Sequence, residues 1–177
     1  LVSDFGHGFI TEEMIKAISR HAKVFAVNTQ TNAANTGYNM ITKYKKPNFV
    51  CLDETEARLA TQDKFSDIQD IAKRIVAKIK SDFLIVTLGK KGSIGVTKKG
   101  EANYTPIFST KVVDTVGAGD AFFAFTAPCF AQGMPLDFVS FIGNAVGALA
   151  VQIMGNKKPV EKHELLEFIH TILNQQR

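Results

Sequence analysis

Apolar residues recur along the chain with two spacings, which together predict alternating strands and helices. Residues 68–79 place Ile71, Ile75 and Ile79 at helical spacing, which indicates a helix with one buried face. Residues 83–88 form a continuous apolar run, typical of a parallel strand that is covered on both faces. This alternation favours an α/β fold with a mostly parallel sheet.

The same patterns and the breaker residues between them predict the other elements. Strands are expected at 1–4, 23–28, 49–52, 93–97 and 102–106, and helices at 12–21, 54–60, 118–131, 136–154 and 161–174. Thr11 is expected to cap the helix 12–21, and Ser66 the helix 68–79 through a capping box with Gln69. Residues 1–4 look like the end of a strand and the chain has no initiator Met, so we expect a fragment or a processed chain.

Composition narrows the class of protein further. The chain has 177 residues, 45% hydrophobic and 21% charged, which excludes a disordered, collagen-like or coiled-coil protein. No apolar run reaches the roughly 18 residues that a membrane span needs. The two cysteines, Cys51 and Cys129, lack metal-ligand spacing and favour a reducing cytoplasm. The net charge of +4 permits an anionic ligand, and we expect no nucleic-acid or membrane partner.

The strongest chemical motif is Asp-Thr-Val-Gly-Ala-Gly-Asp at residues 114–120, between a predicted strand and an apolar helix. The small residues Gly117, Ala118 and Gly119 let a ligand approach the backbone, and N–H groups at a helix N-terminus favour an anion. Asp120, in the first turn, is placed to accept a proton from a hydroxyl held beside a phosphate. These parts make half of a phosphoryl-transfer site. The alternative is a glycine-rich turn with aspartate caps.

A second motif, Asp-Glu-Thr-Glu, follows the strand 49–52. Open parallel sheets bind ligands beyond the carboxyl ends of their strands. Magnesium is held through oxygen atoms, often through water, and Glu56 is a candidate ligand. The alternative is an acidic helix start that satisfies the helix dipole.

A third motif, Thr-Leu-Gly-Lys-Lys-Gly at residues 87–92, ends the strand 83–88. Glycines at this edge would let a nucleotide lie on the backbone, and Lys90 or Lys91 would face its phosphates. The alternative is a plain turn with solvated lysines.

The three motifs, in this order, resemble the C-terminal part of the PfkB (ribokinase-like) carbohydrate kinases, whose second signature is similar to residues 114–120. The resemblance implies a ribokinase-like three-layer α/β/α fold with a mostly parallel central sheet. It implies that residues 1–177 are the C-terminal, nucleotide-binding and catalytic part of a single kinase domain. The family's N-terminal part and lid would then be absent from this chain.

The resemblance also implies roles for individual residues. Asp120 would be the catalytic base, with Gly117, Ala118 and Gly119 as the anion hole. The nucleotide would be bound by Thr87, Gly89, Gly92, Asn144, Asp114 and Thr115. The metal ligands would be Glu56 and Asp53, where Asp53 replaces the Asn of the family's Asn-x-x-Glu motif. The implied cofactors are ATP and Mg²⁺, and for some family members a monovalent cation such as K⁺, here near Asp114 and the loop 155–158.

Within the family, the start of the chain is most similar to the heptose-phosphate kinase module of ADP-heptose synthases. Ser-Asp-Phe-Gly-His-Gly at residues 3–8 resembles that branch's Asp-Tyr-x-Lys-Gly, with departures at Phe5 and His7. The implied reaction is transfer of the γ-phosphate of ATP to a sugar or sugar phosphate, such as heptose 7-phosphate at its anomeric oxygen. The resemblance also implies a homodimer and, in the parent protein, a fused nucleotidyltransferase module. Two alternatives stay open: a non-catalytic nucleotide- or sugar-binding module, and a kinase of a nucleoside or vitamin alcohol.

Overall fold

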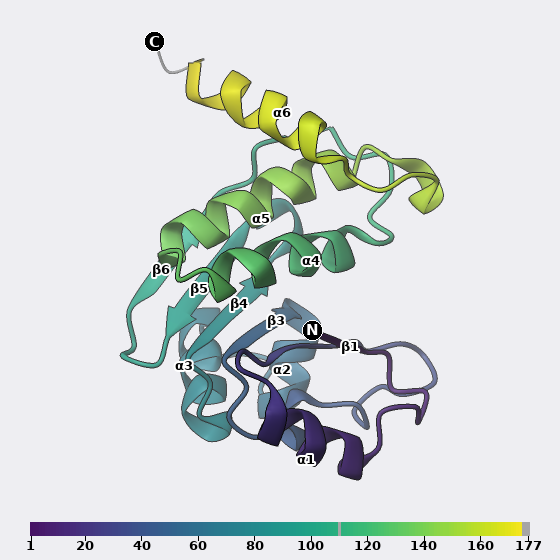
Figure 1. Cartoon of the computed structure of the whole chain (residues 1–177), viewed down its shortest axis with the longest axis vertical. Coiled ribbons are helices and arrows are strands. Elements are labelled where there is room, and N and C mark those ends of the chain that lie inside the picture. Colours follow the sequence, from purple (N-terminus) through teal and green to yellow (C-terminus); the bar gives the residue numbers. More distant parts are fainter. Residues whose placement is uncertain (110, 175–177) are drawn as a thin grey trace. The chain divides into compact units, whose positions relative to one another are not determined.

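The structure is a computed structural model that describes residues 1–109 and 111–174 (Figure 1). In chain order its elements are β1 (Val2–Asp4), α1 (Glu12–His21), β2 (Ala26–Thr29), β3 (Phe49–Asp53), α2 (Glu54–Thr61), α3 (Ile68–Ile79), β4 (Phe83–Thr87), β5 (Ser93–Thr97), β6 (Ala102–Thr105), α4 (Ala118–Ala131), α5 (Leu136–Ala150) and α6 (Lys162–Asn174). Short 3₁₀ turns occur at Ile41–Lys43, Gly89–Lys91 and Met154–Asn156.

The chain divides into two compact units, which are described one at a time. The first unit comprises Leu1–Leu88 and Ile94–Tyr104, and the second comprises Gly89–Ser93 and the described residues from Thr105 onward. Whether both belong to one kinase domain stays a prediction.

The sheet confirms the expected α/β fold. Its strands follow the order β1-β2-β3-β4-β5-β6, and the pairs from β1 to β4 are parallel. Parallel pairing puts the carboxyl ends of β1 to β4 at one edge, where Asp4, Thr29, Asp53 and Thr87 end their strands. This is the edge at which sheets of this kind bind ligands.

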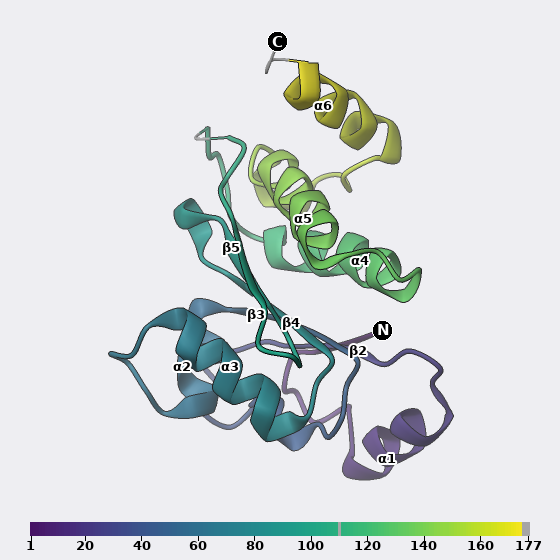
Figure 2. The same ribbon diagram turned by 90° about the vertical axis from the view of Figure 1, so that its left-hand side faces the viewer.

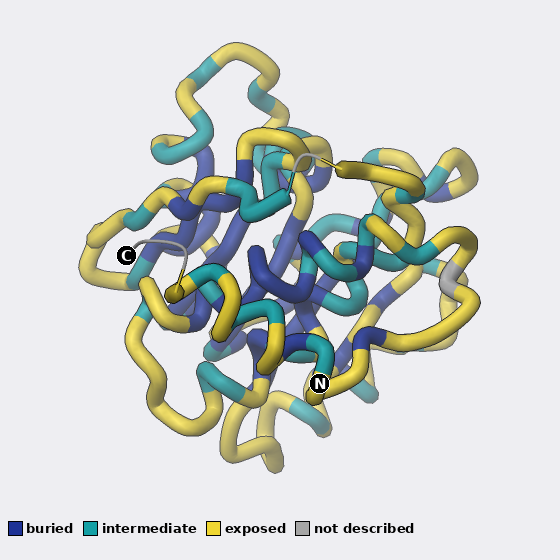
Figure 3. The backbone as a smooth tube through the Cα atoms, turned by 90° about the horizontal axis from the view of Figure 1, so that it is seen from above, coloured by how far each residue is buried: buried dark blue, intermediate teal, exposed yellow. Residues whose placement is uncertain are grey.

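Helices α2 and α3 lie side by side on one face of the sheet in the first unit (Figure 2). The predicted stripe of α3 is buried there, with Ile71 and Ile75 fully enclosed and Ile79 nearly so. Burying an isoleucine contributes about 1.5–3 kcal/mol relative to leaving it in water. The buried residues, dark blue in Figure 3, lie mainly in the strands and on one face of the helices, whereas residues of the connecting segments are mostly exposed.

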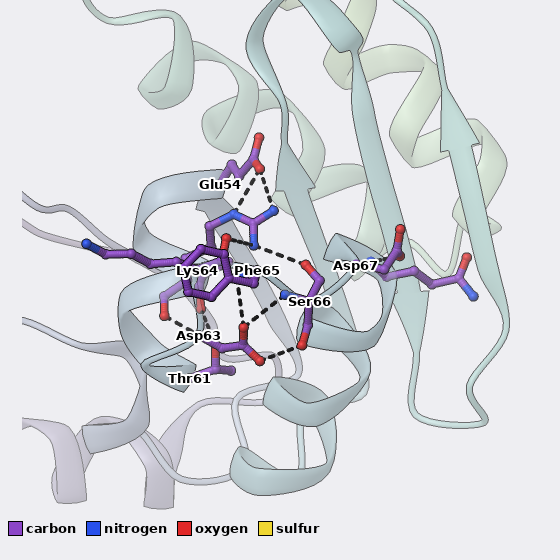
Figure 4. Close-up of polar contacts among 10 residues, drawn as sticks. Glu54, Thr61, Asp63, Lys64, Phe65, Ser66 and Asp67 are labelled. Carbon is purple, nitrogen blue, oxygen red and sulfur yellow. Dashed lines mark hydrogen bonds and ion pairs between the residues drawn. The ribbon is translucent and has the colours of Figure 1, made fainter.

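The entry to α3 differs from the predicted capping box. Asp67 is the N-cap, and its side chain accepts a hydrogen bond from the backbone N–H of Gln69. The Ser66 hydroxyl instead donates to Asp63 at 2.6 Å (Figure 4). Asp63 also accepts from the N–H of Ser66 and from Arg74, and these bonds hold the pKa of its carboxyl well below the usual range. The prediction that Ser66 caps α3 is wrong, because the Ser66 hydroxyl is hydrogen-bonded to Asp63 instead.

The second unit contains α4, α5 and α6, of which α4 packs against α5 and α5 against α6. The bounds of α4 are those predicted. Helix α5 ends at Ala150 rather than 154, because the backbone N–H groups of Val113 and Asp114 both bond to the carbonyl of Val151. No helix within residues 1–109 and 111–174 is long and apolar enough to cross a membrane.

Candidate active site

The start of α4 carries the strongest predicted motif. Gly117 is the N-cap and has a φ of 78°, a left-handed conformation that favours glycine. Asp120 lies in the first turn of the helix and is partly exposed. The first N–H groups of a helix have no acceptor within it and carry the positive end of its dipole. Local chain geometry therefore places the Asp120 carboxylate within one turn of the helix N-terminus, the end of a helix that favours an anion.

The three residues predicted for the anion hole differ in their environment. The N–H of Ala118 donates to the carbonyl of Thr115 at 3.2 Å, which closes the turn. Gly119 is exposed, and a Cβ added there would meet no atom within 4 Å. Open space at Gly119 suits the close approach of a ligand to the backbone, whereas the N–H of Ala118 is already engaged by a protein acceptor.

The Asp114 carboxylate holds the turn before α4 in place. Its Oδ1 accepts from the N–H of Val116 at 3.0 Å, and its Oδ2 accepts from the N–H of Gly155 at 2.8 Å. These backbone donors, first Val116 and then Gly155, keep the pKa of Asp114 below its ordinary value. Thr115 is exposed beside it. The bond to Gly155 connects the motif to the loop after α5, which sequence reasoning had linked to it only as a cation site.

Asp53 and Glu56, the predicted metal ligands, form a capping box at the start of α2. Asp53 Oδ1 accepts from the N–H of Glu56 at 2.7 Å, and Glu56 Oε2 accepts from the N–H of Asp53 at 2.8 Å. Glu56 Oε1 also accepts from the N–H of Thr31 at 3.0 Å. Glu56 is buried and Asp53 is exposed. The structure brings the two carboxylates together at the carboxyl end of β3, with the acidic helix start formed as well.

A metal at this place would need further ligands. In the part of the chain that the structure describes, no three His, Cys, Asp or Glu side chains are grouped to hold a metal ion. Magnesium keeps several waters and takes one or two carboxylates together with substrate phosphates. Because a carboxylate oxygen can accept more than one bond, Asp53 and Glu56 fit a water-mediated role of this kind.

Thr87, Gly89 and Gly92 fall into both units. Thr87 ends β4 in the first unit, and its hydroxyl donates to the carbonyl of Leu52 at 3.4 Å. In the second unit Gly89 and Gly92 belong to one turn, in which the N–H of Gly92 donates to the carbonyl of Gly89. A Cβ at Gly92 would lie 2.0 Å from the backbone oxygen of Thr105. Close backbone packing is thus a sufficient reason for that glycine.

Asn144, predicted to bind the nucleotide, is buried in α5. Its Nδ2 donates to the hydroxyl of Ser93 at 2.6 Å and to the carbonyl of Ser140 at 2.8 Å. The amide nitrogen therefore bonds to protein groups. Sequence reasoning missed Ser93, and a partner 51 positions away leaves no local signal.

A buried cluster at the end of β1 was also missed. Asp4 is 3% exposed and accepts bonds from the Tyr44 hydroxyl, the Lys43 ammonium and the N–H of Gly6. Burial alone would raise the pKa of Asp4, but the bonds from Lys43, Tyr44 and Gly6 outweigh it and hold that pKa below its ordinary value. The cluster fixes the first turn after β1, which also carries the exposed His7.

The first unit contains a parallel sheet whose strands end in polar side chains, and the second contains a glycine turn that opens a helix beside a carboxylate, an arrangement of the kind that binds phosphate in other proteins. The chain matches the pfkB family carbohydrate kinases over residues 6–163, and it belongs to that family. This finding confirms the resemblance on which the sequence interpretation rests.

The chain is also similar to individual proteins and solved structures. It is 25% identical over 169 residues to the bifunctional protein HldE of Koribacter versatilis, an alignment that covers 94% of this chain and 34% of HldE. It is 34% identical over 100 residues to adenosine kinase of Saccharomyces cerevisiae, covering 55% and 29%. Phosphofructokinase-2 from Escherichia coli in complex with potassium has the same fold, with a TM-score of 0.76 at 18% identity over 92% and 52% of the two chains. The chain thus spans about a third of HldE and about half of the kinase structure.

Proposed function

We propose that this chain is the nucleotide-binding and catalytic part of an ATP-dependent carbohydrate kinase. The observation that carries the proposal is the start of α4, where the left-handed Gly117 opens the helix and Asp120 stands in its first turn. An anion-binding turn beside a carboxylate is what phosphoryl transfer to a hydroxyl requires. Membership of the pfkB family supports the same reaction class.

In the proposed reaction the acceptor hydroxyl gives its proton to Asp120 as its oxygen attacks the γ-phosphorus of ATP. A new oxygen–phosphorus bond forms, the bond from the γ-phosphorus to the bridging oxygen breaks, and ADP leaves with that electron pair. Backbone N–H groups of the turn at Gly117 and Gly119 stabilise the charge on the transferred phosphoryl group. The engaged N–H of Ala118 would hold the turn in shape.

The metal role is proposed for the carboxylates at the carboxyl end of β3. When bound with the nucleotide, Mg²⁺ neutralises charge on the phosphates. Glu56 and Asp53 would hold it through water, because both carboxylates already bond to backbone N–H groups. In the same proposal Thr87, Gly89, Gly92 and Thr115 lie along the nucleotide, and the contribution of Asn144 is limited by its bonds to protein groups.

For the acceptor, heptose 7-phosphate is the first candidate, with phosphorylation at its anomeric oxygen. Its support is the similarity to HldE along nearly all of this chain. That relative is described as bifunctional and is about three times as long as the matched region, which is consistent with a fused nucleotidyltransferase module in the parent protein. A homodimer and a cytoplasmic location belong to the same proposal.

A nucleoside kinase is the second candidate. The match to adenosine kinase has the higher identity, 34%, although it covers only 55% of this chain. A non-catalytic nucleotide-binding module is the remaining alternative, and the Asp120 carboxylate argues against it because binding alone needs no base.

The proposal is tested by calorimetric titration with MgATP and MgADP, followed by ADP release against a panel of sugars, sugar phosphates and nucleosides. We expect Asp120→Asn to abolish transfer and to leave MgADP affinity within about twofold of the parent value. Asp137→Asn is the matched control, since Asp137 occupies the first turn of α5. Full activity of Asp120→Asn would exclude the proposed base. Nucleotide binding without transfer to any acceptor would favour the binding module.

A further inference from the structure

The loop after α5 and the turn before α4 are connected by hydrogen bonds at the place where the family resemblance suggested a monovalent cation. Potassium is bound in a structure of phosphofructokinase-2, which shares this fold. A cation that links two such loops must be surrounded by oxygen atoms whose lone pairs point at it. The described residues 113–116 and 151–155 allow that requirement to be checked.

Three oxygens of these two segments accept hydrogen bonds from backbone N–H groups. Asp114 Oδ1 accepts from Val116 and Oδ2 accepts from Gly155. The carbonyl oxygen of Val151 accepts from the N–H groups of both Val113 and Asp114, at 2.8 and 3.0 Å. An N–H directs the positive end of its dipole at its acceptor, so it opposes direct coordination of a cation by that oxygen, just as Asp53 and Glu56 are proposed to hold a metal only through water.

The charges on the loop act in the same direction. Lys157 and Lys158 lie two and three positions after Gly155, and the Lys158 ammonium is paired with Glu164. Lys157 adds an exposed positive charge to the segment that would receive the cation. The donor set and the charge therefore do not fit a monovalent cation at Asp114.

We infer that the Asp114 carboxylate connects the turn before α4 to Gly155 through hydrogen bonds. These bonds hold the phosphate-binding turn in its conformation without K⁺. Asp114 is then a positioning residue, since it acts through the turn that leads into Gly117. The consequence for nucleotide affinity rests on the proposed function. The hydrogen bonds of Asp114 with Val116 and Gly155 are observed in the structure and do not depend on that function.

Two measurements on the full chain test the inference. Amide hydrogen exchange in tetramethylammonium chloride should show Val116 and Gly155 protected by about tenfold or more over unstructured amides, with no change on adding KCl. MgADP titrations at equal ionic strength should give dissociation constants within about twofold in the two salts. Unprotected amides, or binding about tenfold tighter in KCl, would overturn the inference.

Variants separate positioning from general stability. Asp114→Ala should weaken MgADP binding by about fivefold or more in both salts, without rescue by KCl. Asp114→Asn keeps one side-chain oxygen for the N–H of Val116, so its affinity should lie between Asp114→Ala and the parent. Asp137→Ala, which removes another exposed acidic side chain from the second unit, should change the affinity by less than about twofold. Equal effects of Asp114→Ala and Asp137→Ala would contradict a positioning role.

Failure of the proposed function is distinguishable from failure of this inference. If MgADP does not bind in either salt, the proposed nucleotide binding is excluded. The exchange rates of Val116 and Gly155 then still test whether Asp114 holds the turn without K⁺. Protection that is indifferent to KCl would support the connection through Asp114. A saturable rise in protection or in the thermal midpoint with KCl would show a cation at work and overturn it.

Discussion

Glu56 Oε1 accepts a hydrogen bond from the backbone N–H of Thr31 at 3.0 Å, across 25 positions of sequence. The bond joins the segment after β2 to the first turn of α2, while the other oxygen of Glu56 completes the capping box with Asp53. Glu56, one of the predicted metal ligands, thus connects two segments at the carboxyl end of the sheet.

Replacing Glu56 should therefore reduce stability as well as metal-dependent binding. In Glu56→Gln a side-chain NH₂ must face one of two backbone N–H donors, and an unsatisfied buried donor costs about 1–3 kcal/mol. We expect a loss of this size in urea unfolding, and loss of the gain in ADP affinity that Mg²⁺ provides.

Glu54→Gln is the matched control for Glu56→Gln. Glu54 lies in the same helix turn and pairs with Arg58, and a partly exposed pair of this kind is worth about 0–1 kcal/mol. Unchanged stability in Glu56→Gln would show that its bonds to Thr31 and Asp53 contribute nothing. A Mg²⁺ response that persists in this variant would remove Glu56 from the metal site.

The buried pair of Asp4 and Tyr44 predicts a pH-dependent stability. The Tyr44 hydroxyl donates to Asp4 Oδ2 at 2.5 Å, and both side chains are almost fully buried. The pKa of Asp4 in the folded state is lower than its ordinary value of 3.8, so the carboxylate stabilises the fold above that pH. This contribution is lost as the pH falls through the folded-state pKa, because the unfolded chain takes up the proton first.

Tyr44→Phe should lower the free energy of unfolding by about 1–3 kcal/mol near neutral pH. The difference from the parent should shrink as the pH falls below 3.8 and through the lower pKa of Asp4 in the folded state. Urea unfolding followed by circular dichroism at several pH values measures both effects. Tyr38→Phe is the control, since Tyr38 is 90% exposed. A stability difference that is constant down to about pH 2 would refute the coupling to Asp4.

Local signals were sufficient where an element is defined by its own ends. Helix α1 begins after Thr11, whose side chain accepts from the N–H of Met14, as the sequence predicted. Helix α4 begins at Gly117 and ends before Gly133 for equally local reasons. The family motif identified the turn before α4 in the same way, because its chemistry depends on consecutive residues.

Local sequence signals gave wrong predictions where a hydrogen-bond partner far away in the sequence determines the end of a helix or the contacts of a side chain. The apolar run continues past Ala150, but the helix ends where the carbonyl of Val151 accepts from the N–H groups of Val113 and Asp114. Asn144 reads as a ligand-binding amide, yet its nitrogen bonds to Ser93. These pairs lie tens of positions apart, and no periodicity or cap motif encodes them.

The bond between Asn144 and Ser93 predicts that Asn144 acts mainly on stability. Both residues are buried, so Asn144→Ala leaves the Ser93 hydroxyl without its donor, at a cost of about 1–3 kcal/mol. A double-mutant cycle with Ser93→Ala should give a coupling energy of about 1 kcal/mol. MgADP titration of the folded variants should show only a small change, and a large loss of affinity with unchanged stability would instead place Asn144 at the adenine.

Helices α4 and α5 pack closely at Gly143 and Phe122. A Cβ built on Gly143 would lie 2.3 Å from Cζ of the Phe122 ring. The ring is 4% exposed and has little room to move. Alanine has a better helix propensity than glycine by about 1 kcal/mol, but overpacking costs about 1–3 kcal/mol. Gly143→Ala should therefore destabilise the second unit in urea unfolding.

Gly147 provides the matched comparison, because it lies one turn further along α5. A Cβ there would be 3.9 Å from the same phenylalanine ring, an ordinary contact. Gly147→Ala should leave stability unchanged or raise it by up to about 1 kcal/mol. Phe122→Leu in the Gly143→Ala background should cost less than the sum of the single changes, since the smaller side chain makes room for the methyl group. Additive losses, or a stabilising Gly143→Ala, would show that steric contact with Phe122 does not decide the residue at 143.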